Sequence, residues 1–127
     1  MSDTGYFVII HPDATIETVE TPGGCDELHR LLGGFFDNAY LWDFPLSDVL
    51  ASVNDIGKLI GLPINPLATY IYRNPADFIV GDFILQKIVR VGEYDELDQV
   101  PFTESEVRIV LDILTMYKKR WLIEEDL

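Results

Sequence analysis

Short apolar runs, separated by turn residues, make up the first third of the chain. Residues 6–10 are rich in β-branched and aromatic side chains and end at His11-Pro12-Asp13, and residues 15–20 resume with β-branched residues. This pattern predicts a strand, a turn and a partner strand. Glycine pairs then flank residues 25–32, where leucines recur at helical spacing. They predict a short amphipathic helix.

Alternation of apolar and polar positions continues through the middle of the chain. Residues 35–44 alternate, which predicts a strand with one aromatic side. The aromatic residues that share this side are Phe36, Tyr40, Trp42 and Phe44. Residues 49–54 alternate as well, and a turn around Gly57 leads from them to residues 58–60. We expect these two runs to form a hairpin in which Gly57 adopts a positive φ.

Two further strands and an acidic link follow in the second half. Residues 78–80 and 83–91 are apolar runs, and Gly81-Asp82 between them predicts a bulge or turn. Residues 93–98 are mostly acidic and are expected to link the last strand to the C-terminal region.

Capping residues predict two more helices. Asn65 before Pro66 is a good N-cap and N1 pair, so residues 66–72 predict one or two helical turns. Thr103-Glu104-Ser105-Glu106 has the pattern of a capping box, and an apolar stripe at helical spacing follows it. The members of this stripe are Val107, Val110, Leu111, Leu114, Tyr117 and Trp121.

The C-terminal helix has more apolar surface than one stripe provides. Ile109, Ile113 and Met116 widen it beyond the first stripe. The extra surface indicates a second contact, either a homodimer partner or burial by the same domain, and the pattern favours neither.

Together these elements predict one small α+β domain. Residues 1–102 are expected to form a five- or six-stranded, mostly antiparallel sheet with a short helix. Residues 103–127 are expected to form a long helix packed on that sheet or on a partner. A chain of 127 residues that is 48% hydrophobic is long and apolar enough for one substantial core.

The net negative charge of the chain restricts the kinds of molecule that it can bind. The formal net charge is −13, and residues 1–102 carry 16 acidic and 5 basic side chains. Such a surface repels nucleic acid and anionic membranes and attracts basic protein surfaces, although acidity also serves simple solubility. The chain has no run of roughly 18 apolar residues and no basic leader at its start. We therefore expect a cytoplasmic protein that binds neither membrane nor nucleic acid directly.

Residues able to do catalysis are few. Cys25 and His29 lie four residues apart on the predicted helix, where a thiol and an imidazole would share a face. One helical turn seldom presents both groups to a substrate, and no cysteine-enzyme signature surrounds Cys25. His11 and His29 lack a metal-ligand spacing. We expect no catalytic residue, no metal and no cofactor.

Aromatic and basic residues suggest one place for a small ligand. The candidate ligand-binding residues are Trp42, Lys58, Tyr70, Tyr72 and Arg73. Their rings could stack on a base, and their cations could pair with an anion. The competing interpretation is that these aromatic rings fill the core.

The segment from Asn54 to Asn65 carries a family resemblance. Its pattern, Asn-x-x-Gly-Lys-x-x-Gly-Leu-Pro-x-Asn, together with the later Ile79-Val80-Gly81-Asp82, resembles a family of small domains of unknown function. That family is common in genes of phages, plasmids and other mobile elements. The resemblance covers residues 6–91 and leaves the C-terminal helix outside. It implies a setting in which small acidic proteins often act on host defence or nucleic-acid enzymes.

These observations support three hypotheses in order. The first is a non-catalytic binding protein of a mobile genetic element that inhibits a host defence or nucleic-acid-binding protein with a basic surface. The second is a module that binds or sequesters a nucleotide-type signal. The third, and least favoured, is an enzyme.

Overall fold

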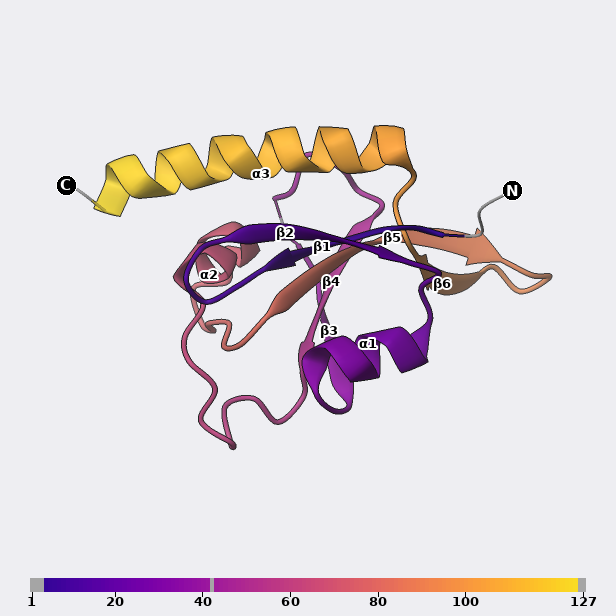
Figure 1. Ribbon diagram of the computed structural model, residues 1–127, viewed down its shortest axis with the longest axis horizontal. Helices are drawn as coiled ribbons and strands as arrows, with labels where there is room; N and C mark the ends of the chain where they lie inside the picture. Colours follow the sequence, from indigo (N-terminus) through magenta and orange to yellow (C-terminus); the bar gives the residue numbers. More distant parts are fainter. Residues whose placement is uncertain (1–3, 42, 126–127) are drawn as a thin grey trace.

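Within residues 4–41 and 43–125, six antiparallel strands form the centre of the molecule, and three helices pack around them. The computed structural model describes residues 4–41 and 43–125 (Figure 1). The strands are β1 (Gly5–Ile10), β2 (Ile16–Thr21), β3 (Phe36–Ala39), β4 (Val49–Asn54), β5 (Phe83–Val91) and β6 (Glu96–Val100). The helices are α1 (Cys25–Leu32), α2 (Pro66–Tyr72) and α3 (Glu104–Glu125). The predicted α+β class, with a short helix and a long C-terminal helix, is confirmed.

The long strand β5 organises the sheet, whose order is β2-β1-β5-β4-β3 with β6 also paired to β5. Lys87 of β5 lies opposite Val49 on one edge and opposite Val100 on the other, so β4 and β6 take opposite edges. The first half of β5 pairs with β1 on the edge that β6 uses further along. One strand therefore holds three others in register.

The sheet curves so strongly that β3 and β6 approach each other. Although β4 and β5 lie between them in the sheet, Gln99 Nε2 of β6 donates to Asn38 Oδ1 of β3 at 2.7 Å. Gln86 Nε2, on the central strand, donates to Ser52 Oγ at 2.7 Å, and both residues are buried. The concave face is thus tied together by amide and hydroxyl groups.

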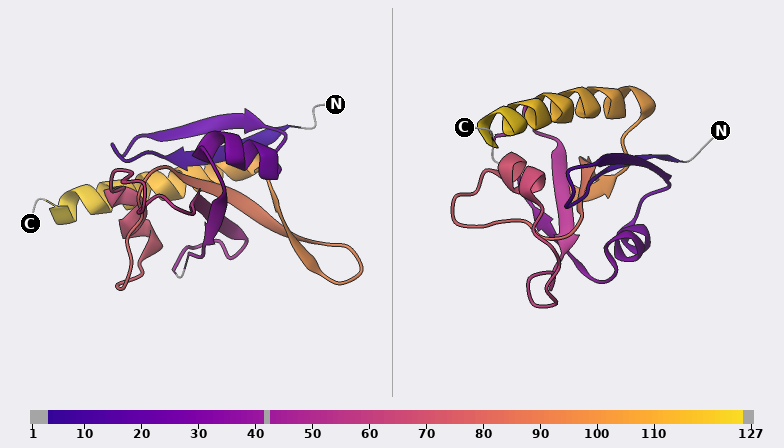
Figure 2. Two further views of the ribbon diagram at one scale, coloured as in Figure 1. Left: turned by 90° about the horizontal axis from the view of Figure 1, so that it is seen from below. Right: turned by 60° about the vertical axis from the view of Figure 1, so that its left-hand side comes forward.

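Apolar side chains fill both faces of the sheet because consecutive residues of a strand point to opposite sides. Val8 and Ile10 belong to the core on the side of α2 and α3, whereas Phe7 and Ile9 belong to a second core that includes Leu28 of α1. Figure 2 shows α1 on the other side of the sheet from α3. This double burial explains why β1 is apolar at nearly every position.

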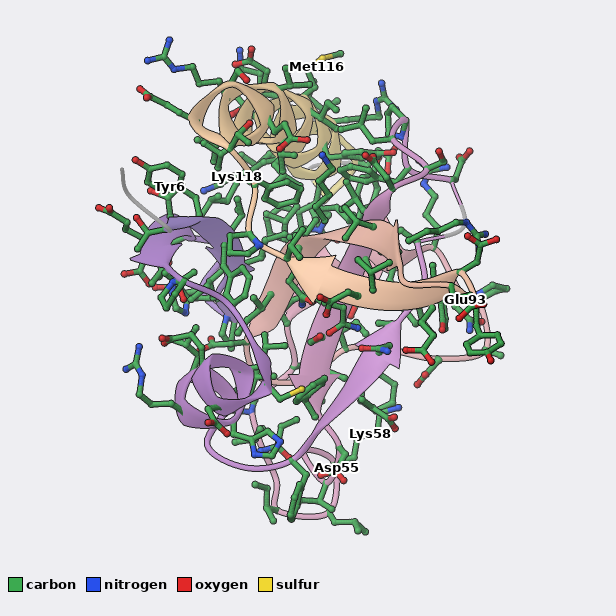
Figure 3. The ribbon with its side chains drawn as sticks, turned by 90° about the vertical axis from the view of Figure 1, so that its right-hand side faces the viewer. Tyr6, Asp55, Lys58, Glu93, Met116 and Lys118 are labelled. Carbon is green, nitrogen blue, oxygen red and sulfur yellow. The ribbon has the colours of Figure 1, made fainter. Side chains whose placement is uncertain are left out.

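Helix α3 is fixed at its start and near its end. Thr103 N–H donates to Glu106 Oε1 at 2.9 Å and Glu106 N–H donates to Thr103 Oγ1 at 3.2 Å, which confirms the capping box. The pKa of Glu106 is lowered overall. Burial alone would raise it, but the hydrogen bonds from Lys87 and Thr103 have the larger effect. Lys118 Nζ donates to Ala14 O at 2.7 Å, reaching from α3 toward the β1–β2 turn (Figure 3).

The predicted hairpin of residues 49–54 and 58–60 is wrong. β4 pairs instead with β3 and β5, and residues 55–61 form turns. The Leu62 N–H donates to Gly57 O at 3.0 Å, which closes the backbone on itself and prevents a return strand. Gly57 has no positive φ, whereas Gly61 (+74°) and Gly81 (+71°) do.

Three other expectations need correction. The strand expected over residues 35–44 covers only Phe36–Ala39, and the link expected over residues 93–98 contains the start of β6. Residues 78–80 form no full strand, because Val80 makes only an isolated bridge with Ile64.

The predicted aromatic side is also wrong. Phe36 packs against the core that includes α1, and Phe44 stacks on Tyr117 at 6.0 Å between ring centroids in the core beneath α3. Tyr40 is exposed, and Trp42 lies outside the described residues. The strand ends at Ala39, so the alternation beyond it no longer places side chains on one face.

Candidate functional site

Asn65 joins three segments that are far apart in the sequence. Its buried amide Nδ2 donates to Ile10 O and to Gly81 O, each at 2.8 Å. Its Oδ1 accepts from Ala68 N–H at 3.1 Å, which caps α2. Both donors of this buried amide and its carbonyl oxygen are therefore hydrogen-bonded, and this residue fixes where the segment before α2 leaves the sheet.

Asn54 fixes the other end of the same segment. Its Nδ2 donates to Leu32 O at 3.0 Å, at the end of α1. Its Oδ1 accepts from Ile56 N–H at 3.0 Å and forms an Asx turn. The chain therefore leaves β4 in a direction set by a side-chain contact with α1.

Between these two ends, the Leu62 side chain packs closely against Gly57 and Gly81. A Cβ at Gly57 would lie 3.2 Å from Leu62 Cδ1 and 2.9 Å from Val80 Cγ2, and a Cβ at Gly81 would lie 2.8 Å from Leu62 Cδ1. The two glycines thus leave the space that Leu62 occupies. Gly81 N–H also donates to Pro63 O at 2.7 Å.

Four large apolar side chains of the segment point into solvent. Leu59 is 86% exposed. Four other large apolar residues near it are exposed as well: Ile56, Ile60, Ile64 and Phe78. We call these five residues the apolar tip. It lies at the end of the molecule opposite α3, where Figure 3 labels Asp55 and Lys58. Clustered exposure of this kind on a folded domain marks a binding surface.

A shallow cavity of about 210 Å³ adjoins the apolar tip. Lys58 and Tyr72 line it together with three carboxylates, Asp37, Asp55 and Asp77. Lys58 forms an ion pair with Asp77, which lowers the pKa of that carboxyl, and its Nζ lies 4.4 Å from the centre of the Phe78 ring. Because the cation is already paired and the other charged groups are carboxylates, the cavity suits a cation better than an anion.

The structure brings together only part of the predicted ligand site. Lys58 and Tyr72 share the cavity, but Tyr70 lies against Tyr117 at 6.3 Å between ring centroids. Arg73 stacks over Tyr70 at 5.5 Å and pairs with Asp43 at 3.6 Å. Burial and the neighbouring Glu124 raise the pKa of Tyr70.

A second cavity, of about 340 Å³, lies in the concave face of the sheet. Its lining includes Cys25 and Leu28 of α1, Tyr40, and Gln99 of β6. The thiol of Cys25 is exposed there, but the His29 ring packs against Phe35 and Phe36 at 5.1 and 5.5 Å between centroids. The imidazole is thus engaged by aromatic rings, and the structure adds no support for a thiol–imidazole pair.

One charged cluster was not anticipated from the sequence. His11 Nδ1 lies 2.7 Å from Asp82 Oδ1, and Nε2 lies 2.8 Å from Glu17 Oε1. The pKa of His11 is raised overall. Burial alone would lower it, but the hydrogen bonds with Glu17 and Asp82 have the larger effect. Both nitrogens can donate only in the imidazolium form, so this form is favoured. His11 directly follows β1 and Asp82 directly precedes β5, and the antiparallel pairing of Ile10 with Phe83 brings the two residues together.

Neither a metal site nor a membrane span is found in the described part of the chain. Within residues 4–41 and 43–125, no group of three or more histidine, cysteine, aspartate or glutamate side chains is arranged to hold a metal ion. None of the helices in those ranges is long and apolar enough to cross a membrane.

Comparison with known proteins identifies a family. The family described as "Domain of unknown function (DUF3846)" matches residues 4–106, which span the whole sheet and the first turn of α3. The chain belongs to this family. The match extends beyond the expected residues 6–91 and includes the start of the C-terminal helix. No curated protein and no solved structure matches the chain. Membership in DUF3846 therefore supports the expected unknown-function family without assigning it an activity.

Proposed function

We propose that this protein is a non-catalytic binding protein whose apolar tip inserts into a groove with a basic rim on a partner protein. The observation that carries the proposal is the exposure of the five apolar side chains beside Asp37, Asp55 and Asp77. Burying a leucine or isoleucine side chain contributes roughly 1.5–3 kcal/mol, so the tip alone could anchor a partner.

The fixed ends of the segment should increase the affinity of the apolar tip for a partner. Asn54 and Asn65 fix both ends of the segment by hydrogen bonds, so little conformational entropy remains to be lost on binding. The carboxylates around the tip, together with a net charge of −13, attract a basic surface and accelerate association.

We further propose a biological setting. In a mobile genetic element, an acidic protein of this kind would act in the cytoplasm of the host and inhibit a defence or nucleic-acid-binding protein. Its carboxylates would occupy the basic surface that otherwise contacts phosphates, and its apolar tip would hold it there.

The nucleotide-type ligand receives less support. The cavity that contains Lys58 and Tyr72 also contains three carboxylates, and Lys58 is paired with Asp77. An anionic ligand would have to break that pair and approach the remaining negative charge. The proposed partner is therefore a protein.

The experiment is affinity capture from host extract with matched leucine variants. Leu59→Ser removes the most exposed apolar side chain of the tip, and Leu97→Ser changes an exposed leucine on β6. We expect the wild type and Leu97→Ser to retain the same basic protein, and Leu59→Ser to lose it. Retention should weaken as salt rises toward molar concentration. Equal recovery by all three proteins would contradict the proposal.

A further inference from the structure

The outer face of α3 carries a second exposed apolar stripe. Ile109, Met116 and Ile123 are 53%, 61% and 65% exposed. Residues seven apart stay on one face of a helix, with a drift of about 20° per heptad. The opposite face is buried on the sheet through Val107, Val110, Leu114 and Tyr117. Figure 3 shows Met116 directed away from the sheet.

Charges beside this stripe are arranged symmetrically about Met116. Asp112 lies four residues before Met116 and Lys119 three residues after it. At about 100° per residue, Asp112 is about 40° and Lys119 about 60° from Met116 on the same flank. Neither side chain forms an ion pair within the part of the chain that the structure describes.

We infer that α3 pairs in antiparallel fashion with α3 of a second copy of this chain, with the twofold axis passing beside Met116. In that arrangement Met116 contacts Met116, and Ile109 lies opposite Ile123 of the other copy. A twofold axis of this kind keeps each flank on its own side and reverses the helix direction. Asp112 of one copy therefore meets Lys119 of the other, and the contact occurs twice.

Other occupants fit this face less well. A parallel pair has its twofold axis along the helices, so the flank that carries Asp112 and Lys119 would lie on opposite sides of the contact in the two copies, and these charges would find no partner. A basic partner, as proposed for the apolar tip, would meet Lys119 and Arg120 beside the stripe. A second copy satisfies both the apolar stripe and the charges.

The pairing goes beyond the proposed function and is independent of it. Because α3 and the apolar tip lie at opposite ends of the molecule, the tips of the two copies would point away from each other (Figures 1 and 3). The dimer would present two binding surfaces at once and gain avidity for a repeated target.

Sedimentation equilibrium from micromolar to near-millimolar concentration tests the assembly. A pair of helices buries an area at the low end of specific interfaces, so we expect a dimer with a dissociation constant of about 1–100 µM. Met116→Glu should leave the protein monomeric over the whole range. Met116→Leu, the matched control, should dimerise within about threefold of the wild type. A wild type that remains monomeric, or a dimer unaffected by Met116→Glu, would overturn the inference.

Charge reversal tests the direction of the helices. Asp112→Lys and Lys119→Asp should each weaken dimerisation about fivefold to tenfold, because both pairs become repulsive. The double variant Asp112→Lys with Lys119→Asp should recover nearly wild-type affinity. Additive weakening in the double variant would refute the antiparallel pairing.

Cysteine cross-linking tests the register, and all variants carry Cys25→Ser to remove the exposed native thiol. Met116→Cys should form a covalent dimer on mild oxidation. Ile109→Cys should not link to itself but should link to Ile123→Cys when the two proteins are mixed. Efficient self-linking of Ile109→Cys would show a different register and reject the proposed axis.

Discussion

The ends of the segment from Asn54 to Asn65 differ from the apolar tip in the polarity of their side chains and in the direction in which those side chains point. At the ends, polar side chains point inward and their amide groups are hydrogen-bonded to distant backbone. At the tip, apolar side chains point outward, with Leu59 86% exposed. Polar groups inside and apolar groups outside reverse the usual distribution.

The contrast teaches which residues of the segment serve the fold and which are free for binding. Changes at the ends should alter stability, because they leave buried groups unpaired or force atoms together. A change at Leu59 should leave stability almost unchanged, because that side chain is 86% exposed. Three predictions test this division and one concerns the neighbouring cluster of His11, Glu17 and Asp82; they run from the largest expected effect on stability to the smallest.

Asn65→Ala should destabilise the protein most. It removes the cap of α2 and leaves Ile10 O and Gly81 O without the Asn65 donor, which we expect to cost about 3 kcal/mol. Chemical denaturation at equilibrium measures the loss. Asn74→Ala is the matched control and should cost less than about 1 kcal/mol, because Asn74 Oδ1 accepts from Ala76 N–H and its Nδ2 makes only a long 3.5 Å bond to Tyr72 OH. Similar losses for the two variants would contradict the structural role of Asn65.

Gly81→Ala should come second. The residue needs a φ of +71°, and its new Cβ would lie 2.8 Å from Leu62 Cδ1, so we expect a loss of about 2 kcal/mol. Gly61→Ala has a similar φ of +74° but open space, and should cost about 1 kcal/mol. The difference between their melting curves isolates the contact with Leu62. Adding Leu62→Ala should therefore relieve part of the effect at Gly81 and none at Gly61.

The His11 cluster should make stability depend on pH. Because the pKa of His11 is raised in the folded state, its contribution is fully present below the unfolded pKa of about 6.5 and is lost as pH rises through the folded pKa. His11→Gln should therefore cost more stability at about pH 5.5 than at about pH 9. Titration of the imidazole by NMR checks the cause, and Glu17→Gln or Asp82→Asn should each lower the His11 pKa. An unchanged titration in both variants would remove this explanation.

Leu59→Ser should have the smallest effect on stability, within about 0.5 kcal/mol, because the side chain is almost fully solvated. Thermal unfolding of this variant beside the wild type measures it. A loss comparable with that of Gly81→Ala would show that the tip belongs to the fold, and the division of the segment would fail.

Local signals explain why much of the fold could be predicted from the sequence. The bounds of α1, β4 and β5 coincide with the apolar runs, and both predicted caps are found. Strand β6 was missed because Leu97 is the single apolar residue among residues 96–99, so the run carries little apolar signal. The false hairpin arose because the pairing of β4 with β5 depends on residues more than thirty positions away.

The site was less predictable, for a geometric reason. Residues two apart on a helix point about 200° apart, so Tyr72 reaches the cavity of Lys58 while Tyr70 turns to Tyr117. The apolar tip had a usable signal. Gly57, Gly61 and Pro63 interrupt the run, and a strand so interrupted cannot bury its apolar residues in a sheet.

The position of Asn65 also affects how long the folded protein persists. Its bond to Ile10 spans 55 residues and can form only after β1, the Gly81 turn and α2 have met. We expect the Asn65 hydrogen bonds to be completed after the folding barrier has been crossed, and an interaction of that kind slows unfolding and leaves the folding rate nearly unchanged. Asn65→Ala should thus shorten the lifetime of the native state about a hundredfold, while refolding proceeds at almost the original speed.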